Sequence, residues 1–238
     1  MTADSASINL THHFLIAMPG LEDAAFAKSV VYVCEHSERG ALGLVINKPS
    51  ELSMQSLFEK VDLSLHREDL INAPVLQGGP VHTERGFVLH DAMLVERPSA
   101  AQDAATQDVP AEIDAEAQAQ AKAEAKALSE VSTQGDDSGQ ESVYASTMTI
   151  PGGLEMTTSK DVLEALSMGA GPKRVLISLG YSAWGEGQLE SELAENSWLT
   201  VGADLSVIFD TPVEQRYERA MQLLGLEPWM LSNEVGHS

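Results

Sequence analysis

The sequence predicts an α+β fold: a mixed, largely antiparallel sheet flanked by about four helices. Three observations lead to this prediction. Apolar, β-branched runs interleave with helical patterns, several strand-like runs are separated only by short turns, and 43% of the residues are hydrophobic, which is ordinary for a globular protein. Recurring hairpins favour a mixed sheet over a purely parallel one. At 238 residues the chain has the length of one domain, and we predict a single domain over residues 1–238.

The first predicted elements are a strand and a connection. Residues 1–9 are small and polar and are expected to fray. Phe14–Met18 is an apolar run stopped by a Pro-Gly pair, which is typical of a buried strand. Residues 21–29 connect it to the next strand, and we expect Phe26 to anchor this connection in the core.

The clearest strands form a hairpin. Val30–Glu35 and Ala41–Asn47 are rich in Val, Ile and Leu and flank the polar turn 36–40. Pro49 cannot donate to a sheet, so the second strand should end before it. Because this strand has hardly any polar face, we predict that it is central and buried.

One helix and two strands should follow the hairpin. Ser53 is a suitable N-cap for a helix over Met54–Val61, whose apolar residues recur on one face. Residues 66–72 are polar and predict at most a short helical turn. Val75–Leu76 and Gly86–Leu89 are predicted strands.

The composition changes over residues 98–142. This segment contains no aromatic residue, and positions 99–142 hold ten acidic and two basic residues. Large apolar side chains are too few to form a stripe that could dock on the core. We predict a low-complexity acidic insertion, disordered or marginally helical, looped out between two strands. The alternative is a segment that folds on contact with a partner.

Regular structure is predicted to resume after the insertion. Tyr144–Ile150 and Leu154–Thr157 have the pattern of strands, and Lys160–Met168 has that of a helix ended by glycines. Arg174–Leu179 is a predicted buried strand that leads into a glycine-rich loop, Gly180–Gly187.

The C-terminal part predicts two helices and two strands. A helix is expected over Gln188–Glu195, and strands over Trp198–Val201 and Leu205–Phe209. The last helix, Val213–Leu224, should open after a proline and close at Gly225.

The net charge of −22 argues against a direct nucleic-acid partner. Lys and Arg total only 14, without a basic run, whereas nucleic-acid affinity comes largely from cations that neutralise phosphates. The single cysteine cannot form an internal disulfide. The N-terminus has no signal-peptide pattern, and no apolar run approaches the ~20 residues of a membrane helix. We therefore expect a cytoplasmic protein that does not associate with membranes.

Several strings match one known signature. YVCEH at Tyr32–His36 and GALGLVINKP at Gly40–Pro49 resemble the signature of the bacterial AlgH/YqgE family. Further matches cover residues 10–237 apart from the insertion: LIAMP (15–19), GGPV (78–81), RGFVLH (85–90), GYSAWGEGQLE (180–190), NSWL (196–199) and GH (236–237). The resemblance implies a compact fold whose sheet bends and closes into a pseudo-barrel. It also implies a transcriptional regulator, but no established reaction, cofactor or catalytic residue.

Cys34 and His36 are the first candidate site. Residues two apart on a strand share a face, and an adjacent imidazolium would lower the pKa of a thiol and activate it. The alternative is that Cys34 is a small buried core residue, which is the usual place of a free cysteine, and that His36 is a solvated or capping side chain.

The glycine-rich segment is the second candidate site. It follows a predicted strand and precedes a predicted helix, where α/β folds bind ligands, and Tyr181, Trp184 and Gly185 are candidate ligand-binding residues. It is not a P-loop, a dinucleotide fingerprint or a nucleophile elbow. The alternative is that the aromatic rings pack and the glycines form turns.

Arg85 is the third candidate, because a guanidinium can bind a carboxylate ligand. It can equally pair with one of the many acidic residues of this chain. The seven histidines lack metal-ligand spacing, so we predict no metal site, and no motif indicates a cofactor.

Two functional hypotheses remain open. The first is a non-enzymatic protein of the AlgH type that binds a protein or small-molecule partner and affects transcription indirectly. The second is an enzyme or thiol-based sensor that uses Cys34 with His36, in a pocket lined by Arg85, Tyr181 and Trp184. A Cys34 buried in apolar surroundings would favour the first hypothesis.

Overall fold

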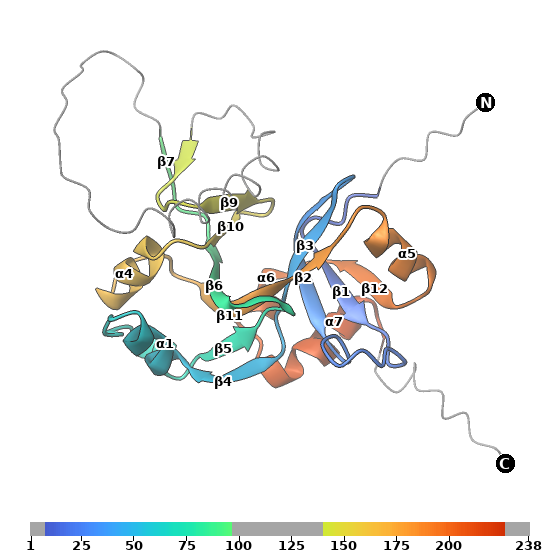
Figure 1. Ribbon diagram of the computed structural model, residues 1–238, viewed down its shortest axis with the longest axis horizontal. Coiled ribbons are helices and arrows are strands. Elements are labelled where there is room, and N and C mark those ends of the chain that lie inside the picture. The colour runs from blue at the N-terminus through green and yellow to red at the C-terminus, as the bar shows by residue number, and fades with distance from the viewer. Residues whose placement is uncertain (1–7, 97–139, 227–238) are drawn as a thin grey trace.

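The computed structural model describes residues 8–96 and 140–226 (Figure 1). Ten strands form one sheet in the order β12-β1-β2-β3-β11-β6-β10-β9, with β5 joined to β11 and β4 joined to β5. Their bounds are β1 His13–Ala17, β2 Val30–Ser37, β3 Gly40–Val45, β4 Pro49–Ser53, β5 Pro74–Gln77, β6 Val81–Asp91, β9 Thr147–Ile150, β10 Leu154–Thr157, β11 Val175–Trp184 and β12 Trp198–Gly202. All pairings in this sheet are antiparallel except β5 with β11. The predicted mixed, largely antiparallel sheet is confirmed.

The sheet is curled into a half-barrel. Ile150 and Leu154, near one end of the strand order, belong to the same buried cluster as Phe14, while Leu199 and Val201 of the opposite edge strand pack against that cluster. Side chains from the two ends of the sheet can share a core only if the sheet bends back on itself. This curvature corresponds to the bent sheet that the family resemblance implies.

Six α-helices lie in the described part of the chain: α1 Met54–Lys60, α2 Glu68–Ile71, α4 Asp161–Ser167, α5 Gln188–Ala194, α6 Leu205–Phe209 and α7 Arg216–Leu223. A 3₁₀ turn, η1 Val213–Gln215, precedes α7. The predicted cap of α1 is present, since the Ser53 hydroxyl accepts a hydrogen bond from the Ser56 backbone N–H. No helix of the described residues is long and apolar enough to cross a membrane.

The buried side chains of the described residues form three clusters, and helices contribute to each of them. Alternate residues of β1 point to opposite faces, so Phe14 and Ile16 join residues of α6 and α7 in the first cluster, whereas Leu15 and Ala17 join Leu189 of α5 in the second. A third cluster lies under α1 and α4. Because many strands are buried on both faces, they appear in the sequence as continuous apolar runs.

The hairpin is confirmed, with a tighter turn than predicted. Ser37 pairs with Gly40, so only Glu38 and Arg39 form the loop. The strand β3 lies between β2 and β11, and Ala41–Val45 is buried throughout. The prediction of a central, buried second strand is therefore confirmed.

The predicted strand Leu205–Phe209 is wrong, because this segment is α6. The Asp204 carboxylate accepts a hydrogen bond from the Ser206 backbone N–H and caps the helix. A short apolar run is compatible with both a strand and a buried helical turn. Here the Asp204 cap favours the helix.

The predicted glycine-rich loop is also wrong over most of its length, because β11 continues through Gly180 to Trp184. Gly180 has a φ of +69° and lies at a register shift between Leu179 and Tyr181. A Cβ at this position would lie 2.7 Å from the Gly79 carbonyl oxygen. The glycine therefore permits a bulge and a close approach of two backbones inside the sheet.

Most of the predicted insertion lies outside the described residues. Just before the insertion and at its C-terminal end, β7 (Leu94–Glu96) and β8 (Gln140–Ser142) pair antiparallel as a separate two-stranded sheet. The last three residues of the predicted insertion are therefore a strand. The sequence also did not predict the short strand β4, which alternates between exposed and half-buried residues and so lacks an apolar run.

Candidate functional site

Cys34 is enclosed in the first buried cluster. Its side chain is 2% exposed, and its thiol donates a hydrogen bond to the Tyr32 carbonyl oxygen at 3.8 Å. Burial raises the pKa of the Cys34 thiol, and the neighbouring Glu35 raises it further. A thiol in these surroundings stays protonated near neutral pH and is a poor nucleophile.

His36 is bonded to other groups than Cys34. Its Nδ1 accepts a hydrogen bond from the Leu10 backbone N–H at 3.0 Å, so the ring proton lies on Nε2, which donates to Glu190 Oε1 at 2.9 Å. A register shift in β2 between Val33 and Glu35 interrupts the side-chain alternation on which the predicted pair depends. The structure therefore does not assemble Cys34 and His36 as a catalytic pair, and this favours the binding hypothesis over thiol chemistry.

The other predicted site residues are divided between two places. Tyr181 stacks on His82 and contacts the ring of Phe87, on the side of the first cluster. Arg85 is half-buried on the neighbouring strand β6, and it is already engaged in a polar or electrostatic interaction. The structure therefore places these two candidates on adjacent strands.

Trp184 and Gly185 lie on the other side of the sheet. Trp184 is buried in the second cluster, and its indole N–H donates to Glu192 Oε2, which also accepts from the indole of Trp198. The Gly185 backbone N–H donates to the Gln188 side chain at the start of α5. These contacts are internal, so both residues serve the packing of α5 in this structure.

A pocket lies elsewhere, between the sheet and the segment that connects α6 to α7. It has a volume of about 370 Å³, within the range of small-ligand sites. Its walls are largely apolar and come from α1, β5, β11, α6 and η1: Met54, Leu76, Leu176, Ile177, Ile208 and Val213. None of the site residues predicted from the sequence lines it.

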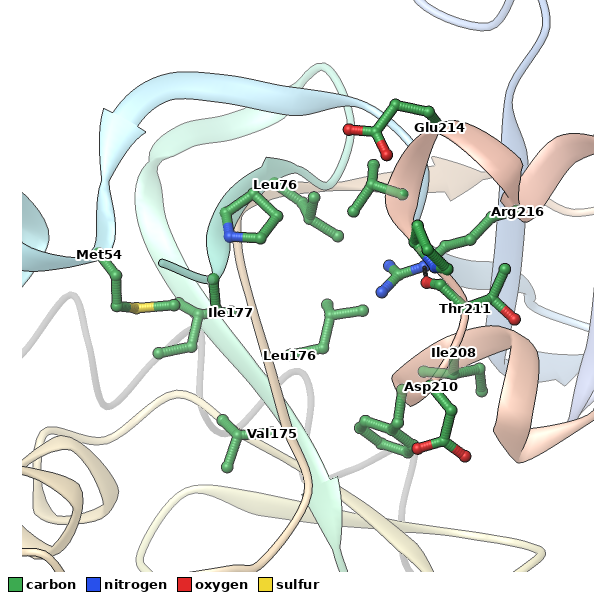
Figure 2. Close-up of a pocket in the computed structure, with 15 residues that line it drawn as sticks. Met54, Leu76, Val175, Leu176, Ile177, Ile208, Asp210, Thr211, Glu214 and Arg216 are labelled. Carbon is green, nitrogen blue, oxygen red and sulfur yellow. Dashed lines mark hydrogen bonds between the residues drawn. The ribbon is translucent and has the colours of Figure 1, made fainter. Parts of the chain in front are cut away.

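Arg216 supplies a positive charge to this pocket. Figure 2 shows its guanidinium turned toward the cavity, on the side of Leu76 and Leu176. Only 7% of the residue is exposed. Its Nη1 donates to the Ile46 carbonyl oxygen at 2.5 Å and its Nε to the Thr211 carbonyl oxygen at 3.0 Å. These neutral acceptors hold the group in place without cancelling its charge.

The electrostatics of Arg216 are those of a desolvated cation. Burial lowers the pKa of the Arg216 guanidinium to about 10, while the nearby Glu214 acts in the opposite direction. The group therefore remains charged at neutral pH. Among the described residues no carboxylate forms a salt bridge with it, although Asp210 and Glu214 lie exposed at the rim of the pocket.

The pattern of the last helix contained a signal for Arg216. Val213, Arg216 and Ala220 are spaced so that they share one helical face, and all three are buried. An arginine on an apolar helical face is unusual, since arginine is rarely buried without a partner. This exception to the apolar pattern indicates that Arg216 has a specific role, although the sequence cannot show that it faces a cavity.

The described residues contain no group of three or more His, Cys, Asp or Glu side chains arranged to hold a metal ion. What the pocket offers is an apolar space of small-molecule size with a fixed cationic donor at its wall. Such an arrangement can bind and orient a small organic molecule. The site is therefore a largely apolar pocket with one cationic donor, built on a curled α+β half-barrel.

Comparison with known proteins identifies the family. A family model described as AlgH-like matches residues 14–229, so the chain belongs to this family. A UPF0301 protein of Paracidovorax citrulli is 68% identical over 239 residues, and one of Acidovorax sp. is 64% identical over 238, with full coverage of both chains in each case. These matches confirm the resemblance seen in the sequence.

Solved structures agree with the family. The solution structure of the AlgH protein from Pseudomonas aeruginosa is 37% identical, with a TM-score of 0.62 and coverage of 98% of both chains. A protein from Corynebacterium diphtheriae with 16% identity has a TM-score of 0.58, covers 94% of this chain and 92% of its own, and shares the fold.

Proposed function

We propose that this protein is a cytoplasmic regulatory binding protein without enzymatic activity. A small ligand occupies the Arg216 pocket and changes how the protein engages a protein partner, so that any effect on transcription is indirect. The observation that carries the proposal is a charged side chain, over nine-tenths buried, that lines an apolar cavity without a carboxylate partner among the described residues.

The position of the pocket supports a link between ligand binding and the rest of the fold. Arg216 is bonded to Ile46, the residue after β3, and Thr211 lies between α6 and η1. A ligand that bonds to the remaining donors of the guanidinium would pull on the same group that holds these two carbonyl oxygens. Binding would therefore affect the position of the chain after β3 and of the α6–α7 connection together. A shift of these segments can change the surface that a partner contacts.

Ligand binding is tested by native mass spectrometry and metabolite extraction on full-length protein purified from its own cells. The wild type should carry a small molecule that a pocket-filling variant, Thr211→Trp, does not. Met168→Trp is the control, because Met168 is exposed and lies outside the pocket. A molecule retained equally by both variants would mean that the ligand binds elsewhere, and the absence of any retained or added ligand would contradict the proposal.

The indirect action is tested with duplex DNA at physiological salt. A protein of net charge −22 should not bind, because the counterion-release term that drives nonspecific binding requires clustered cations. Fluorescence anisotropy with a labelled duplex should show no change up to micromolar protein. Submicromolar binding that weakens steeply with salt would overturn this part of the proposal.

A further inference from the structure

We infer that the ligand of the Arg216 pocket is a monocarboxylate with an apolar body, such as a medium-chain aliphatic acid. This inference rests on the proposed binding function and adds the chemical class of the ligand. It follows from three properties of the pocket: the donor, the walls and the rim.

The donor favours a carboxylate. A guanidinium has five N–H groups in a planar fork that matches the two oxygens of a carboxylate. In Arg216, Nε and Nη1 each make one bond to a backbone carbonyl oxygen, and Nη2 makes none with the described residues. The remaining donors are available on the side of the cavity. A bound carboxylate would form the salt bridge that no carboxylate of the described residues makes with this charge.

The walls favour an apolar body. Leu76, Leu176, Ile177 and Ile208 surround the cavity next to the guanidinium (Figure 2). An alkyl chain that packs against these side chains is removed from water. This contributes about 25 cal/mol to the binding free energy for each Å² of apolar surface buried. A small, strongly hydrated anion would gain nothing from them.

The rim disfavours more than one negative charge. Asp210 and Glu214 are exposed and line the pocket on the two sides of Thr211–Val213. One guanidinium balances one anionic charge, whereas a phosphate monoester or a nucleotide would bring additional charge toward two carboxylates on a protein of net charge −22. A singly charged acid is therefore the best match.

The test compares four probes of equal chain length on the full-length protein: octanoate, 1-octanol, octylamine and octyl phosphate. Binding is followed by methyl NMR, with the methyl groups of Leu176 and Ile208 as pocket reporters and those of Leu189, in the second cluster, as an internal reference. Octanoate should shift the pocket methyls and bind at least ~10-fold more tightly than octanol, which is about the contribution of one charge-assisted hydrogen bond.

Two variants assign this preference to Arg216. Arg216→Met should bind octanoate no more tightly than octanol while keeping its affinity for octanol. Arg219→Met is the matched control, because Arg219 lies exposed on the same helix and outside the pocket, and should behave as wild type. If Arg216→Met does not fold, as judged from its methyl spectrum, Arg216→Gln replaces it.

The outcomes separate this inference from the function on which it rests. Equal affinity for octanoate and octanol at the pocket methyls would overturn the monocarboxylate while preserving the binding function. Tighter binding of octyl phosphate or octylamine would also overturn it. If no probe shifts the pocket methyls and native protein carries no ligand, the binding function itself fails.

Discussion

Cys34 and Arg216 are both buried ionisable side chains, yet only one of them adjoins open space. Burial disfavours the charged form of each, so the pKa of the thiol is raised and that of the guanidinium is lowered. Cys34 is surrounded by the packed side chains of the first cluster. Arg216 bonds to the backbone of Ile46, a member of the same cluster, and also lines a cavity. Burial alone therefore does not define a site; a site also needs space for a ligand and donors that the fold has not satisfied.

The largest expected effect is the loss of folding stability when a leucine is truncated in the closed core or at the pocket wall. Leu44 is fully buried in β3 beside the Cys34 strand, and Leu44→Ala should lower the free energy of unfolding by about 2–4 kcal/mol. Leu176→Ala makes the same chemical change at the pocket. It should cost about 1 kcal/mol less, because it enlarges a space that already exists. Urea unfolding measures both variants, and equal losses would mean that the pocket wall is packed like the closed core.

The next effect is the pH dependence that comes from Cys34. Its folded pKa is raised above the unfolded value, so its contribution to stability is complete below the unfolded pKa of about 8.5 and is lost as the pH rises toward the folded value. Because only the unfolded thiol ionises in that window, the free energy of unfolding should fall by about 2 kcal/mol from this residue by pH 10. Cys34→Ala should lack this component when both proteins are titrated in urea. Identical pH profiles would contradict the enclosed thiol.

The smallest effect is expected from neutralising Arg216. Arg216→Met loses hydrogen bonds to two carbonyl oxygens but also removes a buried charge, and the two changes oppose each other. The free energy of unfolding should change by no more than about 1 kcal/mol in the absence of ligand, as measured by urea unfolding. A loss above about 3 kcal/mol would identify Arg216 as a structural clamp and would weaken the comparison with Cys34.

The sequence by itself determined much of the fold. The buried hairpin, the Ser53 cap of α1 and the strand β10 are local features, set by apolar periodicity, side-chain capping and turn residues within a few positions. The family was also determined by the sequence, because its strings are distributed along the chain. Two local predictions were wrong because the same residues suit two structures: α6 was predicted as a strand, and the strand through Gly180 as a loop.

Only the tertiary structure decided which side chains meet. The bulge in β2 places Cys34 and His36 in different surroundings, and the internal bonds of Trp184 commit its indole to α5. The Arg216 pocket joins α1, β5, β11 and the α6–α7 connection, segments that are spread over residues 54–216 of the chain. No periodicity or motif in the sequence predicts that these segments are in contact, because the contact depends on how the curled sheet brings distant elements together. In the sequence Arg216 shares a helical face with Val213 and Ala220, and the fold placed it beside an open cavity.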